Sequence, residues 1–371
     1  MKQHDKDHQF KTTADRAAPP AQEARRAFDG AAPVACPCEE ESCGCSSQGE
    51  AEGERRSCCA PSSSGAGRVK AGSEPASRSG LGFEGRMFFR FTRWPVMGVY
   101  ARLAGTWLDV RADRAWPAAA TELVGQMLIA AALQVSAADK GGKVSMRLDG
   151  KGEWLELASV AASGDGTCRA ALSVDDAKAF DPDKGVAGLA GQGAKMTVDY
   201  RYENGETFRM EVPVTAGGLE GALTWRLRSD RRPDKLFRLA ANEEVAAGLM
   251  LMFAPNMAVD GGVEAELDAF GRDAKSLSDE ALLGPRPKDV LRDLFFRDRL
   301  DFDKPEPFVF GCDCDRKTMG WAVKRMGQEA AREAIRKDGV VTARCPYCSK
   351  SYSFGADDLL SLFAESSPSS N

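Results

Sequence analysis

Four cysteines near the C-terminus place the strongest constraint on how this chain can fold. Cys312 and Cys314 form a C-x-C pair, and Cys345 and Cys348 form a C-x-x-C pair. Two such pairs, separated by a stretch long enough for a helix, are the usual sequence pattern of a zinc site. Four thiolates select zinc over harder metals and close a tetrahedral site that has no open position for a substrate. The site is therefore expected to be structural or redox-active, and not hydrolytic.

The residues around the cysteines predict elements that bring the two pairs together. Residues Arg316–Lys337 carry apolar side chains at three- and four-residue intervals, which predicts one amphipathic helix, and Gly339 is placed to cap it. Strands are expected over Val340–Ala343 and Ser351–Phe354, on either side of a tight knuckle, and a closing helix over Asp357–Phe363. So short a segment buries little apolar surface, and bound metal would supply much of its folding free energy.

Several short motifs in this region occur together in one known family. They are FGCDCDR at 310–316, DGVV at 338–341, CPYC at 345–348 and YSF at 352–354. Together they resemble the zinc domain of the heat-shock protein 33 family, the redox-regulated bacterial holdase chaperones. A weaker resemblance upstream, through GKGE at 150–153, CRA at 168–170 and AGLML at 247–251, extends the similarity over roughly residues 86 to 363.

The resemblance implies an ATP-independent chaperone that binds unfolded or partly unfolded client proteins and prevents their aggregation under oxidative stress. The organisation expected is a disordered, Cys-rich extension over 1–85, a chaperone core domain over 86–257, a helical linker over 258–311 and a zinc-binding redox-switch domain over 312–371. Zinc is the cofactor expected, and a homodimer formed on oxidation is left open.

Cysteine chemistry indicates how such a switch would work. An oxidant attacks a thiolate, the neighbouring cysteine resolves the sulfenic acid, and the metal is lost. Close spacing makes Cys312 with Cys314, and Cys345 with Cys348, the expected disulfides. The resemblance further implies that the small domain then unfolds, that the linker helices lose their anchor, and that apolar surface becomes available to clients.

The region before the linker predicts an α+β fold with helices packed on a sheet. Hairpins are expected from Val144–Leu148 with Trp154–Val160 and from Lys195–Tyr202 with Thr207–Val214, the second around the tight-turn dipeptide Asn204-Gly205. Strands and helices interleave without regular βαβ repetition, so a doubly wound fold is disfavoured.

Two further segments complete the expected core. A strand is predicted over Val99–Val110, followed by a helix that Pro117 opens. The apolar stretch Leu123–Val135 is shorter than the ~20 residues needed to cross a bilayer, so it predicts a buried core helix and not a membrane span. Cys168 is expected to be a small buried core residue. In the linker, an apolar stripe within Lys288–Phe296 is expected to pack onto the core.

Two positions depart from the family pattern. The sequence has Arg114-Ala115-Trp116-Pro117 where the family usually has a histidine and an aromatic residue before the proline. It has Ser229-Asp230-Arg231, within a basic segment, where Ser-Glu-Gln is typical. Both changes are expected to leave the cysteine switch untouched and to affect the substrate-facing details of the core.

Composition argues against other functions. A formal net charge of -5 disfavours a nucleic-acid footprint, which needs a concentrated basic surface. The first thirty residues lack the apolar segment of a secretory signal, and with eleven cysteines this favours a reducing, cytoplasmic location. Both histidines, His4 and His8, lie in the N-terminal extension, so the folded part has no histidine general base and no enzyme is expected.

Two alternatives remain open. The N-terminal extension holds six closely spaced cysteines, which form either incidental thiols in a flexible segment or a second metal or redox site: Cys36, Cys38, Cys43, Cys45, Cys58 and Cys59. As an alternative to the chaperone, the C-terminal cysteines could belong to a zinc-ribbon module that binds protein or nucleic acid without redox switching. Such a module would keep its metal under oxidation.

Overall fold

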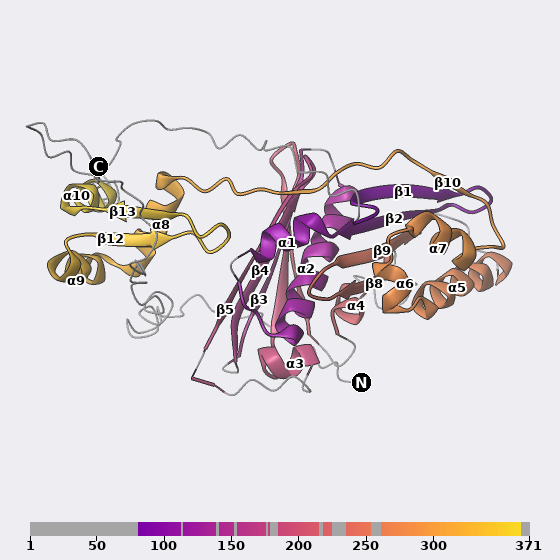
Figure 1. Cartoon of the computed structure of the whole chain (residues 1–371), viewed down its shortest axis with the longest axis horizontal. Helices are drawn as coiled ribbons and strands as arrows, with labels where there is room; N and C mark the ends of the chain where they lie inside the picture. The colour runs from indigo at the N-terminus through magenta and orange to yellow at the C-terminus, as the bar shows by residue number, and fades with distance from the viewer. Residues whose placement is uncertain are drawn as a thin grey trace, which may run out of the picture.

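The computed structural model describes residues 81–112, 114–138, 141–151, 154–175, 177–178, 185–214, 218–224, 235–253 and 261–364. These residues form two large sheets with a long helix between them, and a small two-stranded sheet near the C-terminus (Figure 1). The expected α+β fold class is confirmed. Residues 1–80, which hold all six extension cysteines, and the Ser229-Asp230-Arg231 departure lie outside the described residues.

The first sheet has five strands in the order β10-β1-β2-β9-β8. Its strands are β1 (Gly85–Phe91), β2 (Val96–Leu103), β8 (Lys235–Ala241), β9 (Ala246–Phe253) and β10 (Leu300–Phe302). Strands β2 and β9 are buried along almost their whole length because elements cover both faces of this sheet.

The prediction of one strand over Val99–Val110 is wrong in its second half. Strand β2 ends at Leu103, and α1 (Gly105–Arg111) follows it. The carboxylate of Glu84 accepts hydrogen bonds from the backbone N–H groups of Ala104, Gly105 and Thr106 at 2.7, 3.1 and 3.2 Å. A carboxylate that satisfies the free N–H groups at a helix start favours a helix there, and Glu84 is too distant in sequence to be recognised as the cap.

The second sheet has six strands in the order β11-β5-β4-β3-β6-β7. Its strands are β3 (Lys143–Asp149), β4 (Leu155–Ser163), β5 (Thr167–Val174), β6 (Lys195–Arg201), β7 (Thr207–Pro213) and β11 (Val309–Phe310), and the short helices α3 (Gly185–Ala190) and α4 (Gly218–Leu223) lie near its ends. Both predicted hairpins are confirmed, with β3 antiparallel to β4 and β6 antiparallel to β7. Gly205 adopts a φ of +86° in the second turn, which suits glycine.

Helix α2 (Ala118–Ser136) lies between the two sheets and joins them in one apolar core (Figure 1). It begins at Ala118, and Pro117 is the residue before its first turn. By length and composition α2 could cross a membrane, but 78% of its most apolar window is buried within the protein. The predicted core helix is therefore confirmed.

The linker covers the outer face of the five-stranded sheet with α5 (Gly261–Ser276), α6 (Asp279–Leu283) and α7 (Pro287–Leu294). The predicted packing of its apolar stripe is confirmed, because Leu291 and Phe295 are each only 1% exposed and the Phe295 ring centroid lies 5.0 Å from that of Phe91. The linker is not only helical. Strands β10 and β11, which the sequence analysis missed, pair antiparallel with β1 and parallel with β5, respectively.

Side chains of the core donate hydrogen bonds to the carbonyl groups at the C-terminal end of α6. The buried hydroxyl of Tyr100 donates to the Leu282 carbonyl oxygen at 2.7 Å. Tyr100→Phe leaves this buried acceptor without its donor, at a cost of ~1–3 kcal/mol. We expect hydrogen exchange in α6 to accelerate while exchange in α2 stays unchanged. Tyr202→Phe, in the β6–β7 turn, is the control, and equal exchange in both variants would contradict this role of Tyr100.

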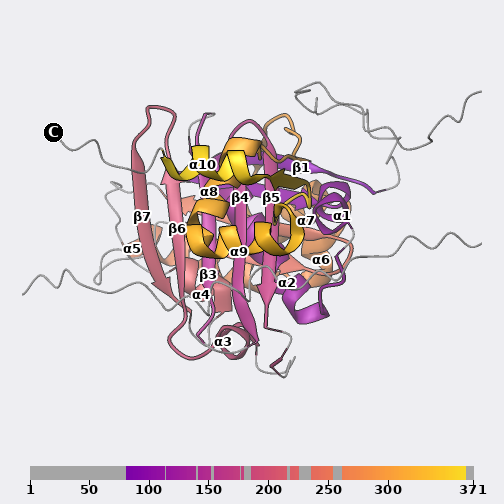
Figure 2. The ribbon, with the colours of Figure 1, turned by 90° about the vertical axis from the view of Figure 1, so that its left-hand side faces the viewer.

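The C-terminal part lies against the outer face of the six-stranded sheet (Figures 1 and 2). Its elements are α8 (Arg316–Met326), α9 (Gln328–Asp338), β12 (Val341–Arg344), β13 (Ser351–Phe354) and α10 (Ala356–Ala364). The single helix expected over Arg316–Lys337 is wrong, because Gly327 takes a φ of +94° and separates α8 from α9. The predicted cap is confirmed, with Gly339 left-handed at φ +75°.

Candidate metal centre

The structure brings the four C-terminal cysteines together from two loops. Cys312 and Cys314 lie between β11 and α8, and Cys345 and Cys348 lie between β12 and β13. The four sulfur atoms all lie within 4.8 Å of one another. The Sγ atoms of Cys312 and Cys345 are 3.7 Å apart, and those of Cys314 and Cys348 are 3.3 Å apart.

These distances fit a four-sulfur metal site. A tetrahedron with metal–sulfur bonds of about 2.3 Å has sulfur–sulfur edges of about 3.8 Å, so the group needs little movement to close around zinc. Cys345 is buried and the other three are half-buried. The arrangement can hold a metal ion, and thiolate donors in this number suit zinc.

Local structure explains why each loop presents its sulfurs in this way. Asp315 caps α8 by accepting a hydrogen bond from the Thr318 backbone N–H at 2.6 Å, which starts the helix directly after the C-x-C pair. In the knuckle, the Ser349 N–H donates to the Cys345 carbonyl oxygen at 2.9 Å, and Ser349 itself takes a positive φ of 60°. This tight turn points both knuckle sulfurs toward the same centre.

Electrostatics within the cluster favour thiolate formation at one position. The hydrogen bond with the Cys312 thiol lowers the pKa of Cys345 to about 4, with further help from the backbone N–H groups of Cys348 and Tyr347. The same hydrogen bond, followed by burial, raises the pKa of Cys312. A stabilised thiolate is the form that binds metal and reacts with oxidants.

Tyr352 supports the first cysteine pair from strand β13. Its hydroxyl donates to the backbone carbonyl oxygen of Cys314 at 2.9 Å and lies 3.4 Å from the Cys314 Sγ. This contact ties the C-x-C loop to the small sheet that carries the knuckle.

The core domain also contacts the cysteine loops, which the sequence analysis missed. Arg114 donates to the carbonyl oxygens of Pro346 and Tyr347 in the knuckle. The departure at Arg114, which was expected to affect the substrate-facing details of the core, therefore also contacts the loop that carries Cys345 and Cys348. Its partner positions are more than two hundred residues away in sequence, and no local pattern announces such a contact.

Cys168 stands apart from the cluster. It lies in β5, is 1% exposed, and has its pKa raised by burial. The prediction that it is a small core residue is confirmed.

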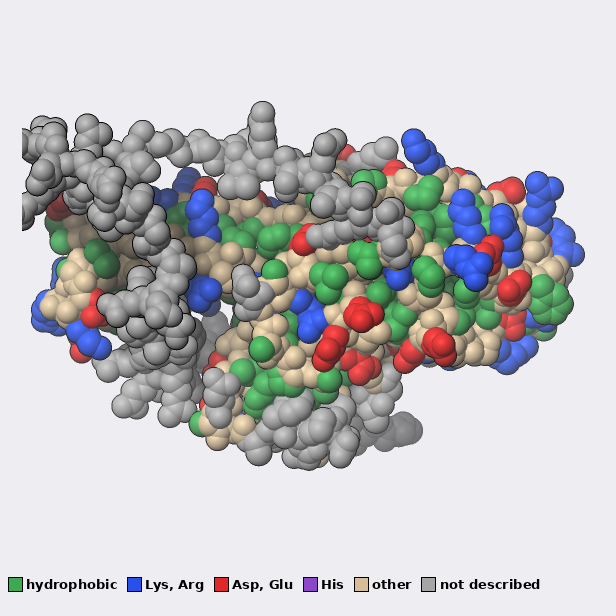
Figure 3. Space-filling model, viewed as in Figure 1, with side chains coloured by type: hydrophobic (Ala, Val, Ile, Leu, Met, Phe, Trp, Pro, Cys, Tyr) green, Lys and Arg blue, Asp and Glu red, His purple; other side chains and the backbone are tan. Residues whose placement is uncertain are grey.

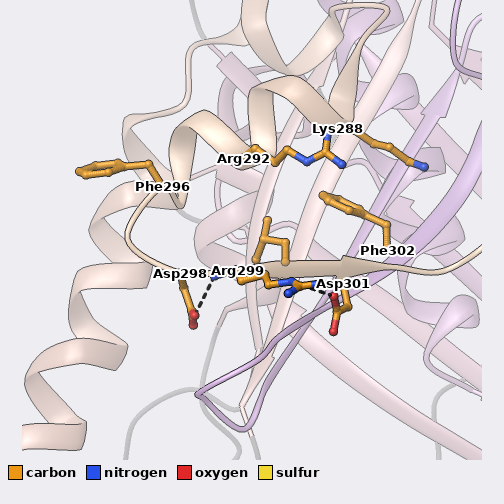
Figure 4. A pocket seen from close by; sticks show the side chains of 8 residues that line it. Lys288, Arg292, Phe296, Asp298, Arg299, Asp301 and Phe302 are labelled. Carbon is orange, nitrogen blue, oxygen red and sulfur yellow. Dashed lines mark hydrogen bonds and ion pairs between the residues drawn. The ribbon is translucent and has the colours of Figure 1, made fainter.

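A hollow lies between α7 and β10, away from the cysteines (Figure 4). Lys and Arg side chains gather on the surface at this end of the molecule (Figure 3). Lys288 Nζ and the Arg292 guanidinium lie 5.6 and 5.3 Å from the centre of the Phe302 ring. The residues that line the hollow are charged or apolar, and they include Lys288, Asp298 and Asp301.

Two sheets around one helix, a linker that pairs with both sheets, and a four-cysteine cluster together define an α+β protein with a C-terminal cluster that could hold a metal ion. The family model described as Hsp33 protein matches residues 87–355, so the chain belongs to the Hsp33 family of chaperones.

Curated relatives and a solved structure agree with this membership. A 33 kDa chaperonin of Chromobacterium violaceum is 30% identical over 280 residues, which cover 74% of this chain and 92% of the relative. A 33 kDa chaperonin of Neisseria meningitidis serogroup B is 27% identical, with 76% and 91% covered. The structure of the 33 kDa chaperonin (Hsp33 homologue) from Thermotoga maritima has a TM-score of 0.60 at 20% identity, covers 76% of this chain and 99% of that one, and supports the fold. These relatives are named as chaperonins and not as enzymes.

Proposed function

We propose that this chain is a redox-regulated, ATP-independent holdase that binds unfolded or partly unfolded client proteins when its cysteine centre is oxidised. The observation that carries the proposal is the convergence of four cysteine sulfurs within 4.8 Å, in a chain of the Hsp33 family. The resting state is the reduced form, with zinc on Cys312, Cys314, Cys345 and Cys348.

In the reduced form the four thiolates hold the C-terminal elements together. Zinc bound to such a site contributes of the order of 10 kcal/mol or more of folding free energy. The apolar cluster of this part is small, and its buried side chains include Phe354 at 2% exposed and Val323 at 1%. A domain with so small a core depends on its ligated cysteines.

Oxidation removes the ligands. A cysteine thiolate attacks one oxygen of hydrogen peroxide, the O–O bond breaks, and a sulfenic acid and hydroxide form. The neighbouring thiol then attacks the sulfenic sulfur, a disulfide forms, and water leaves. Each peroxide thus oxidises two cysteines to one disulfide and yields one hydroxide and one water, and the hydroxide takes a proton from solvent to give the second water. Cys312 with Cys314, and Cys345 with Cys348, are the proposed pairs, and disulfide sulfurs no longer bind the metal as thiolates do.

The linker would carry this change to the core. Strand β11 ends two residues before Cys312, so unfolding of the cysteine loops would release the chain end of the linker. The helices α5 to α7 cover an apolar face of the five-stranded sheet that includes Phe89, Phe91 and Leu251. We propose that this face and the linker's own apolar stripe bind clients once the linker is loosened.

The proposal also covers organisation and surroundings. We infer a core domain over 86–257, a linker over 258–311 and a switch domain over 312–371, acting in a reducing cytoplasm without nucleic-acid or membrane partners. A zinc-ribbon module is the competing function. Zinc content and free thiols measured before and after mild peroxide, together with suppression of client aggregation, separate the two, because a ribbon module keeps its metal.

The N-terminal extension provides a separate prediction. Deleting residues 1–80 is expected to leave zinc content, the unfolding temperature and peroxide-induced client binding nearly unchanged, because the family match begins at residue 87. Metal analysis of both forms checks this. A second equivalent of zinc that disappears on deletion would show instead that the extension cysteines form a metal site.

A further inference from the structure

Arg114 connects the core directly to the knuckle that carries Cys345 and Cys348. Its Nη1 donates to the carbonyl oxygen of Ala170 in β5 at 2.7 Å. Its Nη2 donates to the carbonyl oxygen of Pro346 at 3.0 Å and also to that of Tyr347. The guanidinium lies 5.2 Å from the centre of the Trp116 ring, which fixes its direction. One planar side chain therefore joins a core strand to the two residues between the knuckle cysteines.

Arg169, on the same strand β5, reaches both cysteine loops. Its Nη1 forms an ion pair with Asp313, the residue between Cys312 and Cys314. Its guanidinium also stacks on the Tyr347 ring, with 4.7 Å between the guanidinium carbon and the ring centre. The Arg169 side chain is 17% exposed, so this pair lies in a partly desolvated position.

Two further contacts complete the same interface. The Tyr347 hydroxyl lies 2.9 Å from the Ser159 hydroxyl on β4, and Lys143 Nζ on β3 lies 3.9 Å from the Asp313 carboxylate. All of these contacts meet the residues enclosed by the two cysteine pairs, Asp313 in one and Pro346 and Tyr347 in the other. Figure 2 shows the C-terminal part lying over the face of β3, β4 and β5, the strands that carry Lys143, Ser159 and Arg169.

We propose that Arg114 and Arg169 are positioning residues that set how readily the cysteine centre gives up its metal and reacts with oxidant. We call their interactions with Asp313, Pro346 and Tyr347 the docking contact. The docking contact requires each loop to hold the shape in which its two sulfurs point at the common centre.

The coupling follows from linkage. Interactions that favour one shape of the loops favour every other process that needs the same shape, so docking strengthens metal retention and metal binding strengthens docking. The core also covers one side of the loops, and Cys345 is buried while the other three cysteines are half-buried. Loss of the docking contact should therefore make the cysteine centre release its metal more readily. This inference rests on the proposed function for the identity of the metal ligands.

The test measures transfer of zinc from the reduced full chain to a chromogenic chelator. Arg114→Gln removes a charged donor shared by two knuckle carbonyls, and we expect zinc to transfer about tenfold faster than from the wild type. Arg169→Gln should accelerate transfer several-fold. Arg114→Lys should give little rescue because one ammonium cannot span the three carbonyl oxygens, whereas Arg169→Lys should restore part of the ion pair to Asp313.

The dependence of the zinc-transfer rate on salt concentration is a second measurement. It would not change if Arg169 only stabilised the fold. Asp313 is 74% exposed, so ions should weaken its pair with Arg169, and transfer from the wild type should quicken between low and high ionic strength. Arg169→Gln should lose most of this salt dependence. Arg209→Gln is the matched control, because Arg209 lies on the same sheet and pairs with Asp199 instead of with the cysteine loops. It should behave as the wild type.

The outcomes separate the docking contact from the proposed function. Wild-type transfer rates in both Gln variants, with their zinc content intact, overturn the docking contact even if oxidised protein holds clients. Faster zinc transfer in the variants supports the docking contact, whether or not the oxidised protein binds clients. Failure of the oxidised protein to bind clients would overturn the holdase proposal alone. If the wild type holds no zinc, the rate of thiol alkylation in the same variants decides, with faster alkylation supporting the contact and equal rates overturning it.

Discussion

Hydrogen peroxide is expected to switch the reduced, zinc-loaded protein from an inert form to one that suppresses aggregation of an unfolding client. One zinc should be released per chain as four thiols are lost, with disulfides Cys312–Cys314 and Cys345–Cys348. Helix content should fall, because α5 to α9 lose the packing that supports them, while the two core sheets persist. Reductant with zinc should reverse all of these changes.

Three measurements on one time course check this expectation. Chelator absorbance follows zinc, mass mapping after alkylation follows the disulfides, and light scattering of a heat-unfolded client follows holding. Mild heating should accelerate all three, because the C-terminal part has the smallest of the three apolar clusters in the described residues and should open most easily. If zinc is released and both disulfides form with no gain in client binding, the centre has only a structural role and the holdase proposal is wrong.

Replacing one ligand is expected to have the second large effect. Each of four thiolates contributes about a quarter of a zinc-binding free energy of ~10–16 kcal/mol, so Cys312→Ser should weaken binding by about two to three orders of magnitude. The C-terminal elements should lose hydrogen-exchange protection as the metal leaves. Competition with a calibrated chelator gives the affinity, and exchange mass spectrometry gives the protection.

Cys168→Ala is the control for this substitution. Cys168 is a buried cysteine of the core that lies outside the cluster, so its loss should change core stability slightly and zinc affinity not at all. Full zinc affinity in Cys312→Ser would remove the ligand assignment, and weakened zinc binding in Cys168→Ala would show that core stability alone controls the metal.

Elements whose pattern is complete within a few residues were predicted well. The β6–β7 hairpin follows from Asn204-Gly205 between two alternating strands, and α2 follows from one long apolar run. The elements that were missed depend on distant partners. Glu84 starts α1 through its carboxylate, and β10 and β11 are too short to form a pattern until the edges of β1 and β5 are available to pair with them.

The break between α8 and α9 has a different origin. Apolar residues recur at helical spacing on both sides of Gly327, so the periodicity alone indicated one helix. Glycine is tolerated inside helices at a cost of ~1 kcal/mol, and nothing local decides whether it continues or ends one. Packing against the neighbouring elements of the small domain decided that Gly327 turns the chain.

By itself, the sequence identified the four cysteines that come together near the C-terminus, because residue type and pair spacing can be read without knowing how the rest of the chain is arranged. Tertiary structure alone decided what surrounds that centre. Arg114 and Arg169 meet Pro346, Tyr347 and Asp313 only after the six-stranded sheet has formed and the linker has brought β11 to its edge. Residues so far apart in the sequence form no periodic pattern or fixed spacing that would predict their contact. The packing of the folded chain sets the geometry of such a contact.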